Sequence, residues 1–319
     1  MGKIRVGVVG VGYLGQFHAE KYATMDGVEL VGVVDIDPTR SKEIAQRYRT
    51  QAFLHHAHLF DKIQAVSIAV PTLLHYPIAR DFFSQGIDVL LEKPISQTLE
   101  EADELIGLAE SKALVFQVGH LERFNGALTA LEGIVQTPVY VEARRLSPFP
   151  GRGTDVNVVL DLMIHDIDIL LSLVDSKVER IDAMGIPILT PHSDIANAWI
   201  DFENGCRANL TVSRVSTEKV RRTLIFLPNG ILSIDYLAQK ASFARKGGQD
   251  EALGIVTEEM PITRVDSLEV EILAFLQSVR DRKQARVSGR DGKRALEVAL
   301  RITRKIDEGG LRKANLPVV

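Results

Sequence analysis

The first part of the chain alternates short apolar runs with segments of helical spacing. Helical stretches separate the runs, and Leu99–Ser111 is the clearest of them. The apolar runs have the length and composition of buried strands, which we expect at 4–9, 28–34, 65–70, 87–91 and 114–118. Regular alternation of strand and helix is typical of a parallel, doubly wound sheet. The pattern therefore predicts an N-terminal α/β domain that covers residues 1–119.

After Gly119 the pattern changes to alternating strands joined by tight turns. The turns at 203–205 and 228–230 each contain Asn-Gly, which is a strong hairpin signal between alternating strands. Strands are expected at Val139–Arg145, Ala196–Phe202, Cys206–Arg214, Arg222–Leu227 and Ile231–Tyr236. Helices are expected at Ala127–Val135, Val156–Val174, Ser267–Arg280 and Gly292–Ile306. We expect a second α/β domain over residues 120–319, with an open, largely antiparallel sheet, and the terminal helices are free to pack back on the first domain.

Composition narrows the class of protein. The 319 residues, 45% hydrophobic and 25% charged, suit two globular domains, and the net charge of −4 disfavours extended nucleic-acid binding. No apolar run approaches the roughly 20 residues that span a bilayer. The single cysteine, Cys206, excludes an intrachain disulfide, and the start leads into a strand without the apolar stretch of a signal peptide. We expect a cytoplasmic protein with no nucleic-acid or membrane partner.

An open sheet with helices on one face leaves its other face to be covered. A second copy of the same chain can supply that cover. We therefore expect a homodimer or homotetramer that forms through the C-terminal sheet.

A glycine-rich turn follows the first expected strand and precedes a helix-like segment. Its spacing is Gly10-x-Gly12-x-x-Gly15, which matches a dinucleotide-binding fingerprint. Gly10 permits the tight turn, Gly12 lets the backbone approach a pyrophosphate, and Gly15 lets the helix pack close to the strand. Tyr13 and Leu14 lie inside this loop, and we expect both to contact the coenzyme. The first domain is therefore expected to be a Rossmann domain.

An acidic residue stands where such a domain holds the adenosine ribose. Asp35 ends the second expected strand, about 20 residues past Gly15, and a carboxylate there can accept hydrogen bonds from the ribose hydroxyls. A carboxylate would repel a 2′-phosphate, which favours NAD over NADP as the cofactor. Arg40 follows closely and is able to neutralise such a phosphate, so NADP remains the alternative.

A lysine lies just past the fourth long apolar strand, in the sequence Glu92-Lys93-Pro94. The carboxyl ends of parallel strands are where open α/β sheets bind ligands. A partly desolvated ammonium at Lys93 can hydrogen-bond a substrate hydroxyl and stabilise negative charge on its oxygen. Pro94 stiffens the backbone there, which favours a functional role over a solvated loop lysine.

A second candidate site lies in the helix expected at 156–174. Asp161 and His165 are four residues apart and share one helix face, so the carboxylate can orient the imidazole. Such a histidine can accept a hydroxyl proton as hydride leaves the same carbon. Asp168 shares the face and supports the pair. The alternative is an aspartate that caps the helix beside a packed histidine.

These motifs together resemble the glucose-fructose oxidoreductase / inositol dehydrogenase family, written Gfo/Idh/MocA. The resemblance extends over the whole chain, and its motifs are the glycine fingerprint with Asp35, Val70-Pro71-Thr72-x-x-His75, Glu92-Lys93-Pro94 and Asp161-x-x-x-His165. It implies an NAD(P)-dependent oxidoreductase of sugar-like alcohols, with Lys93, Asp161 and His165 as catalytic residues. It also implies that Pro71, Thr72, His75 and Glu92 border the cofactor.

Within the family, two segments are similar to members that oxidise nucleotide sugars such as UDP-N-acetylglucosamine at the 3-hydroxyl. These segments are 118–125 and 158–165. Guanidinium groups near these segments can hold a diphosphate. Arg144 and Arg145 are successive strand residues and point to opposite faces of the sheet, so at least one of these arginines is expected to be solvated. The expected substrate contacts, besides Asp161 and His165, are His120, Arg123, Arg145 and Arg152. The alternative for 120–123 is an interdomain hinge with ordinary salt pairing.

Other interpretations of the sequence stay open. A polyol or inositol dehydrogenase of the same family is one, and a non-catalytic NAD-binding sensor is another, because fold alone does not establish function. Reduction of a bilin or a dihydrodiol is a further possibility in relatives of the fold. The histidine cluster at 55–58 has no second group of ligands at metal spacing, so we expect a solvated loop and no metal. His18 is expected only to pack near the glycine turn.

Overall fold

The computed structural model describes residues 2–149, 151, 156–247 and 254–309. The chain forms two compact units, one of Met1–Leu121 with Asp266–Lys293, and one of Glu122–Val265 with Arg294–Val319. Helix α8 (Gly289–Glu308) therefore begins in the first unit and ends in the second. Among the described residues, no helix combines the length and the apolarity that a membrane crossing requires.

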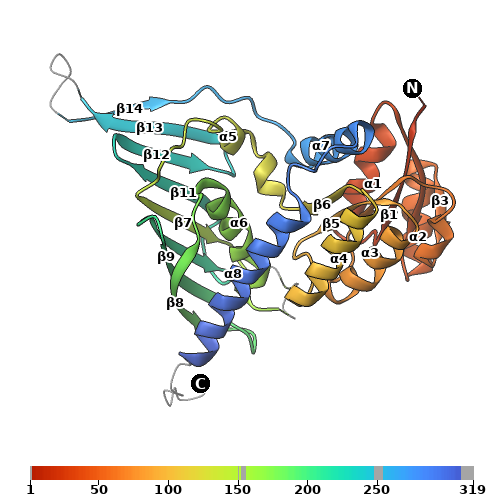
Figure 1. Cartoon of the computed structure of the whole chain (residues 1–319), viewed down its shortest axis with the longest axis horizontal. Coiled ribbons are helices and arrows are strands. Elements are labelled where there is room, and N and C mark those ends of the chain that lie inside the picture. Colours follow the sequence, from red (N-terminus) through yellow and green to blue (C-terminus); the bar gives the residue numbers. More distant parts are fainter. Residues whose placement is uncertain (1, 150, 152–155, 248–253, 310–319) are drawn as a thin grey trace. The chain divides into compact units, whose positions relative to one another are not determined.

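Unit 1 is a six-stranded, wholly parallel sheet in the order β3-β2-β1-β4-β5-β6 (Figure 1). The strands are β1 (Ile4–Val9), β2 (Val28–Val34), β3 (Gln51–Phe53), β4 (Ala65–Ile68), β5 (Asp88–Glu92) and β6 (Phe116–Gly119). The helices are α1 (Gly15–Thr24), α2 (Pro38–Tyr48), α3 (His75–Ser84), α4 (Leu99–Ser111) and α7 (Ser267–Asp281), with short 3-10 turns η1 (His56–Leu59), η2 (Thr72–Leu74) and η3 (Leu121–Phe124). The expected doubly wound parallel sheet is confirmed.

Local sequence accounts for several helix boundaries in unit 1. Thr98 and Glu101 form a reciprocal capping box at the start of α4. Asp37 accepts the amides of Thr39 and Arg40 and so begins α2. One core forms where α1, α2 and α7 pack on the sheet through buried side chains such as Val8, Tyr22, Ile44 and Phe275.

Unit 2 is an eight-stranded sheet in the order β14-β13-β12-β11-β7-β10-β9-β8 (Figure 1). Its strands are β7 (Tyr140–Leu146), β8 (Val178–Ile186), β9 (Ile195–Phe202), β10 (Arg207–Ser213), β11 (Val220–Leu227), β12 (Gly230–Asp235), β13 (Lys240–Lys246) and β14 (Ile255–Glu259). Only β7 and β10 pair in parallel; the other neighbours within the described strands are antiparallel. The second part of α8 packs with α5 (Gly126–Thr129) and α6 (Ile164–Leu173) against the sheet to form the core of this unit.

The largely antiparallel sheet and both Asn-Gly hairpins were expected, and the structure contains them as β9–β10 and β11–β12. Two expected helices differ. The helix expected at Ala127–Val135 ends at Thr129, and Gly133 adopts a φ of +79°, which an α-helix does not accommodate. The helix expected at Val156–Val174 is in two parts, a π-helical turn η4 (Val159–Met163) followed by α6. Strands β3, β8, β13 and β14 were not expected.

Candidate functional site

In unit 1 the predicted coenzyme residues lie at the carboxyl ends of four strands. The glycine loop follows β1, Asp35 follows β2, Pro71 and Thr72 come shortly after β4, and Lys93 follows β5. Since β2, β1, β4 and β5 are consecutive neighbours in a parallel sheet, these segments share one sheet edge. The strand order reverses between β1 and β4, and such a switch point is where open α/β sheets bind ligands.

The three glycines of the loop differ in whether the fold has room for a side chain at their positions. At Gly10, φ is +80° and a Cβ would lie 2.6 Å from the carbonyl oxygen of Ala69. At Gly15, a Cβ would lie 1.7 Å from the carbonyl oxygen of Gly10. At Gly12, by contrast, a Cβ would meet no described atom within 4 Å, and the residue is exposed. Chain packing therefore requires Gly10 and Gly15 but not Gly12, and this fits a pyrophosphate that approaches the backbone at Gly12.

Asp35 and Arg40 both contact the glycine loop. Asp35 Oδ2 accepts the amide of Val11 at 2.9 Å, so its carboxylate lies beside the loop. The Arg40 guanidinium donates to the carbonyl oxygen of Val11 at 2.8 Å and to Gln16 Oε1 at 2.9 Å, and it pairs with Glu43. These acceptors engage the arginine that a 2′-phosphate would need, whereas Asp35 stands at the position of the ribose carboxylate. The geometry favours NAD.

Exposed apolar side chains surround the same edge. Tyr13 and Leu14 in the loop are 58% and 44% exposed, Ile36 after β2 is 88% exposed, and Leu73 after β4 is 59% exposed. A planar aromatic base is suited to cover exposed apolar side chains of this kind.

Lys93 lies in a segment with well-defined neighbours. It is half-buried, and its backbone amide donates to Glu92 Oε2 at 3.3 Å. The peptide bond between Lys93 and Pro94 is cis. His75, placed beside the cofactor by the family resemblance, is buried, with Nδ1 2.7 Å from the carbonyl oxygen of Pro94 and Nε2 2.9 Å from that of Val70. Burial lowers the pKa of His75, although both carbonyl groups act in the opposite direction.

In unit 2, the π-helical turn and the helix that follows it carry the second candidate pair. Asp161 lies in η4 and His165 in the first turn of α6, and both side chains are half-buried. Single π-turns inserted at a helix are frequent at functional sites. The cap of this segment comes from Asn157, whose Oδ1 accepts the amides of Val159 and Leu160. The capping role considered for Asp161 is thus supplied four residues earlier.

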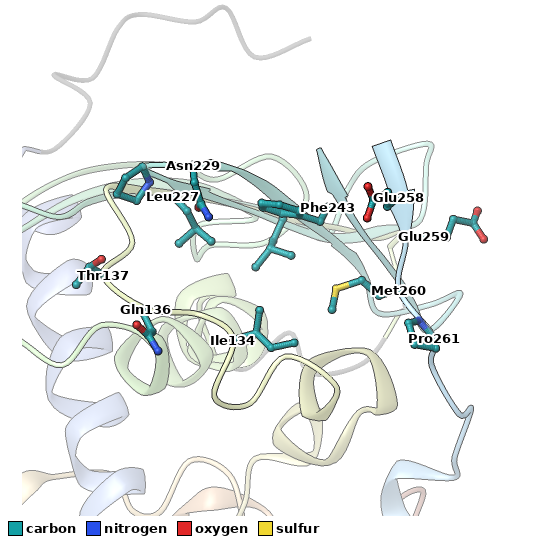
Figure 2. A pocket seen from close by; sticks show the side chains of 12 residues that line it. Ile134, Gln136, Thr137, Leu227, Asn229, Phe243, Glu258, Glu259, Met260 and Pro261 are labelled. Carbon is teal, nitrogen blue, oxygen red and sulfur yellow. The ribbon is translucent and has the colours of Figure 1, made fainter. Parts of the chain in front are cut away.

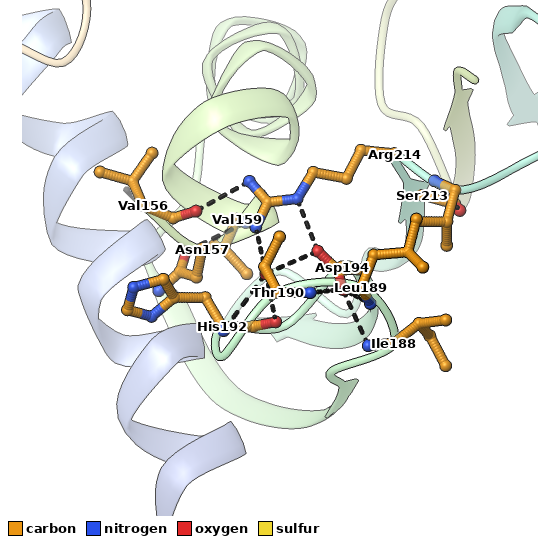
Figure 3. Close-up of polar contacts among 11 residues, drawn as sticks. Val156, Asn157, Val159, Ile188, Leu189, Thr190, His192, Asp194, Ser213 and Arg214 are labelled. Atoms are coloured by element: carbon orange, nitrogen blue, oxygen red, sulfur yellow. Dashed lines mark hydrogen bonds and ion pairs between the residues drawn. The ribbon is translucent and has the colours of Figure 1, made fainter. Parts of the chain in front are cut away.

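A buried ion pair holds the chain just before η4 (Figure 3). Arg214 and Asp194 are fully buried, and Arg214 Nε donates to Asp194 Oδ1 at 2.8 Å. Arg214 also donates to the carbonyl oxygen of Val156 at 2.8 Å. Burial alone would raise the pKa of Asp194, but Arg214 and the amides of residues 188–190 lower it far below its ordinary value. The pair therefore stays charged and fixes the entry to η4.

The arginines expected to contact substrate have different environments. Arg145 is buried, with two nitrogens donating to Asp166 at 2.8 and 2.9 Å and a third to Glu122 at 3.0 Å. Arg123 is half-buried and pairs with Asp168 at 3.6 Å. The carboxylates beside Arg145 occupy all three of its nitrogens, which leaves Arg123 better placed to meet a ligand. Arg152 lies outside the described residues, and His120 is buried in unit 1.

Cysteine and histidine side chains outside these segments have environments that argue against a catalytic or metal-binding role. Burial raises the pKa of Cys206 to about 11, so its thiol is a poor nucleophile. His56 is half-buried and contacts Asp81 at 3.0 Å, rather than lying in a fully solvated loop. Among the described residues, no group of three or more His, Cys, Asp or Glu side chains is arranged to hold a metal. His18 does more than pack, because its Nε2 lies 3.2 Å from Glu92 Oε1.

A cavity of about 570 Å³ opens in unit 2 beside β12, β13 and β14 (Figure 2). Its lining includes Ile134, Leu227, Phe243 and Met260, with Glu258 and Glu259 at one side. The predicted catalytic and substrate residues are absent from that lining, and the candidate site is therefore elsewhere in the described chain.

The strand order, the glycine loop and Asp35 define unit 1 as a dinucleotide-binding domain. A family profile described as an oxidoreductase family with an NAD-binding Rossmann fold matches residues 4–120, and a GFO/IDH/MocA C-terminal domain profile matches residues 126–233. The chain belongs to this Gfo/Idh/MocA family of oxidoreductases. It is an NAD-binding dehydrogenase, as the motifs indicated.

Some known relatives match this chain over nearly its whole length and others over part of it. A UDP-N-acetylglucosamine 3-dehydrogenase from Acidithiobacillus ferrooxidans is 37% identical over 302 residues, which is 94% of this chain and 96% of the relative. A solved structure with that description and organism has a TM-score of 0.91 at 36% identity and covers 97% of this chain and 99% of its own. An inositol 2-dehydrogenase from Rubrobacter xylanophilus is 30% identical over 62% of this chain and 59% of its own length. Levoglucosan dehydrogenase in complex with NADH and L-sorbose, at 18% identity and a TM-score of 0.86 over 97% of this chain and 98% of its own, shares the fold.

Proposed function

We propose that the protein oxidises the 3-hydroxyl of UDP-N-acetylglucosamine, or of a similar nucleotide sugar, with NAD as hydride acceptor. The observation that carries the proposal is the 37% identity to a UDP-N-acetylglucosamine 3-dehydrogenase, which extends over 94% of this chain and therefore includes unit 2. The inositol dehydrogenase match covers a smaller part of the chain. Because function depends on specific sites rather than on a shared coenzyme fold, similarity that includes unit 2 bears on the substrate more than similarity in the coenzyme domain alone does.

The catalytic roles follow from the chemistry of three side chains. His165 removes the proton from the sugar hydroxyl, and Asp161 orients its imidazole. The ammonium of Lys93 hydrogen-bonds the same oxygen and stabilises the negative charge that builds up as the proton leaves. NAD, when bound, accepts the hydride from the sugar carbon, and the product is a 3-keto sugar.

Cofactor binding falls to the residues of the unit 1 sheet edge. In this proposal the loop 10–15 faces the pyrophosphate, Asp35 faces the ribose, and Pro71, Thr72 and Glu92 border the nicotinamide half. Arg40 holds the loop through Val11 rather than a phosphate of NADP.

Substrate binding is proposed for the polar residues near the catalytic helix. Arg123 is a candidate for the diphosphate, since its contacts with Asp168, at 3.5 and 3.6 Å, both involve Nη1, and a guanidinium can bind a phosphate through two nitrogens. His120 and Arg152 remain candidates from the sequence. Arg145 is retained as a residue that shapes the site through Asp166, which is adjacent to His165.

The test is a substrate panel followed by product analysis. The purified protein is incubated with NAD and UDP-N-acetylglucosamine, UDP-N-acetylgalactosamine, free N-acetylglucosamine or myo-inositol, and reduced nicotinamide is followed by absorbance. We expect turnover with UDP-N-acetylglucosamine and a keto group at C3 by NMR. Faster turnover of myo-inositol would instead favour the polyol dehydrogenase. Tight NAD binding with no turnover across the panel would favour the sensor.

An oligomer is proposed with this activity. On the sheet face opposite the core of unit 2, the ring of Tyr140 lies 5.8 Å from that of Trp199 and 5.3 Å from that of Phe226, and all three are half-buried. We infer that a second copy covers this aromatic cluster, giving a homodimer or homotetramer. Sedimentation of the wild type and of Trp199→Arg tests it: we expect a smaller species for the variant, and a monomeric wild type would refute it. A cytoplasmic location is proposed as well, in keeping with the single cysteine.

A further inference from the structure

Two histidines from different helices of unit 1 contact the short segment that carries Lys93. His18 lies on α1, the helix that begins at the glycine loop, and His75 begins α3. Both side chains are 1% exposed, so neither is placed to meet a substrate directly. Each nevertheless contacts a residue adjacent to Lys93 in the sequence, His18 on one side and His75 on the other.

His18 reaches Lys93 through the Glu92 carboxylate. The Nε2 atom of His18 lies 3.2 Å from Glu92 Oε1, and Glu92 Oε2 accepts the backbone amide of Lys93 at 3.3 Å. Burial works to raise the pKa of Glu92, but His18 and the charge of Lys93 outweigh it and leave that pKa below its ordinary value. Gly119 on the neighbouring strand leaves room for this carboxylate, since a Cβ there would lie 3.1 Å from Glu92 Oε2. Glu92 is therefore an ionised carboxylate held in one place.

On the side of its ring away from Glu92, His18 contacts Ser67, which in turn contacts Tyr22. Its Nδ1 lies 3.2 Å from Ser67 Oγ, and Ser67 Oγ lies 2.7 Å from the hydroxyl of Tyr22. If His18 donates Nε2–H to Glu92, then Ser67 can donate to Nδ1 and Tyr22 can donate to Ser67. In that arrangement each donor along the chain has an acceptor. The contact that fixes the tautomer and the ring orientation of His18 is the one from Ser67, and Tyr22 contacts only Ser67.

His75 acts on the other side of Lys93. Its Nδ1 lies 2.7 Å from the carbonyl oxygen of Pro94, which is a short distance for an N–H···O hydrogen bond. Its Nε2 lies near the carbonyl oxygen of Val70, just before the expected cofactor residues Pro71 and Thr72. Burial lowers the pKa of His75, and a neutral imidazole carries one N–H. With that proton on Nδ1, His75 donates to Pro94 and ties the start of α3 to the segment after β5, while Nε2 only lies against Val70.

We propose that His18 and His75 are positioning residues that hold Lys93 from two sides, His18 through Glu92 and His75 through Pro94. The inference rests on the proposed function, because it assigns them a purpose in placing the catalytic ammonium. Misplacement of a catalytic group by about 1 Å can cost about 100-fold in rate, so contacts to the residues on either side of Lys93 can affect turnover. Neither histidine transfers a proton to or from the substrate.

The kinetic test compares His18→Leu with the conservative His18→Gln. His18→Leu removes the donor to Glu92, and we expect kcat to fall about 10- to 100-fold while the KM for the sugar and the Kd for NAD stay unchanged. His18→Gln retains an amide donor and should restore most of kcat. In a Glu92→Gln background, His18→Leu should have no further effect, because the two residues act as one unit. A raised Kd for NAD with unchanged kcat would overturn the inference.

Tyr22→Phe is the matched control. It removes a buried hydroxyl at the far end of the chain but leaves Ser67 able to donate to His18, so kcat should remain that of the wild type even if the melting temperature falls. A loss of kcat in Tyr22→Phe equal to that in His18→Leu would show that general destabilisation, rather than positioning, is responsible. His75→Leu extends the test to the second side, with a similar loss of kcat expected.

A readout independent of turnover separates this inference from the proposed function. Hydrogen exchange of the Lys93 amide, followed by mass spectrometry of the peptide that contains it, should be faster in His18→Leu and unchanged in Tyr22→Phe. A wild type that does not turn over sugar nucleotides would contradict the proposed function only, because the exchange result would still decide the positioning role. Unchanged exchange and unchanged kcat in His18→Leu would contradict the positioning role only. Should His18→Leu fail to fold, Ser67→Ala weakens the same chain and carries the same expectations.

Discussion

At the scale of single residues, substitution of Gly10 should affect folding, whereas substitution of Gly12 in the same loop should affect coenzyme binding. Gly10→Ala should destabilise the protein by about 1–3 kcal/mol, because φ is +80° there and the Cβ would contact the carbonyl oxygen of Ala69. Gly12→Ala meets no described atom, so it should leave the melting temperature unchanged and weaken NAD binding by about 10-fold or more. Calorimetric titration with NAD and thermal melting measure both. Equal NAD affinity in Gly12→Ala and the wild type would contradict the placement of the pyrophosphate.

Asp35 gives a prediction on coenzyme choice. Asp35→Asn retains an oxygen that can accept the amide of Val11 but removes the negative charge, so the preference for NAD over NADP should fall by about 10-fold. The ratio of kcat/KM for the two coenzymes measures the effect. Asp26→Asn, well away from the glycine loop in the sequence, is the control and should leave the ratio unchanged. An unaltered ratio in Asp35→Asn would mean that another residue discriminates the 2′-phosphate.

Residues whose partners are near in sequence were predicted best. The glycine spacing and the distance to Asp35 lie within one β-α-β unit, so the tight loop after β1 and the position of Asp35 beside it were predicted from the sequence. His18 was expected only to pack, because its partner Glu92 is 74 residues away. Arg145 was expected to contact substrate, and nothing local signalled that Asp166 and Glu122 would occupy its guanidinium. Pairings between distant charges depend on tertiary packing, which a single sequence does not specify.

At the scale of elements, the entry to the π-helical turn depends on a buried ion pair. Arg214→Met leaves Asp194 buried without its main partner, which should destabilise unit 2 by about 3–5 kcal/mol. Denaturant unfolding followed by the fluorescence of Trp199, the single tryptophan of the chain and a residue of β9, reports on that unit. The exposed pair of Arg180 and Asp182 provides the control, and Arg180→Met should change stability by less than about 1 kcal/mol. A loss of similar size in both variants would contradict a special role for Arg214.

Helix α7 contains a buried carboxylic acid, Glu271, and its titration should make the stability of the protein depend on pH. Burial and the charge of Glu92 raise the pKa of Glu271 well above its ordinary value, and neither carboxyl oxygen has a hydrogen-bond partner in the described part of the chain. The pKa of Glu271 is therefore higher in the folded protein than in the unfolded chain. Its contribution to the free energy of unfolding is fully present below the unfolded pKa and is lost as the pH rises through the folded pKa.

Glu271→Gln should remove that loss. Relative to the wild type, the variant should be more stable at pH 8 than at pH 5 by about 1 kcal/mol or more. Thermal melting followed by circular dichroism at the two pH values measures the difference, with the exposed Glu29→Gln as the control. A difference from the wild type that does not change with pH would show that Glu271 titrates normally.

Elements were predicted where their signals are local. The Asn-Gly turns predicted β9–β10 and β11–β12, and the parallel sheet followed from the alternation of strands and helices. The parallel pairing of β7 with β10 was not predicted, because it joins Tyr140–Leu146 to Arg207–Ser213 with no turn between them. The π-helical turn was also missed, since the apolar spacing of 156–174 is compatible with one continuous α-helix.

At the scale of the whole molecule, the proposed catalytic residues come from both units. Lys93 belongs to unit 1, whereas Asp161 and His165 belong to unit 2. Family membership rests on both units, since one profile matches residues 4–120 and the other 126–233. The central claim is that Lys93 and His165 serve the same sugar hydroxyl.

The most direct test of that claim is the turnover of Lys93→Ala, His165→Ala and the double variant with NAD and UDP-N-acetylglucosamine, beside Lys42→Ala and His58→Ala as controls. Each single catalytic variant should lose about 100- to 10,000-fold in kcat, and the double variant should lose little more than the worse single one, because residues that act as a unit are not additive. The controls should retain wild-type turnover. Wild-type turnover in either single catalytic variant, or fully additive losses in the double variant, would contradict the account.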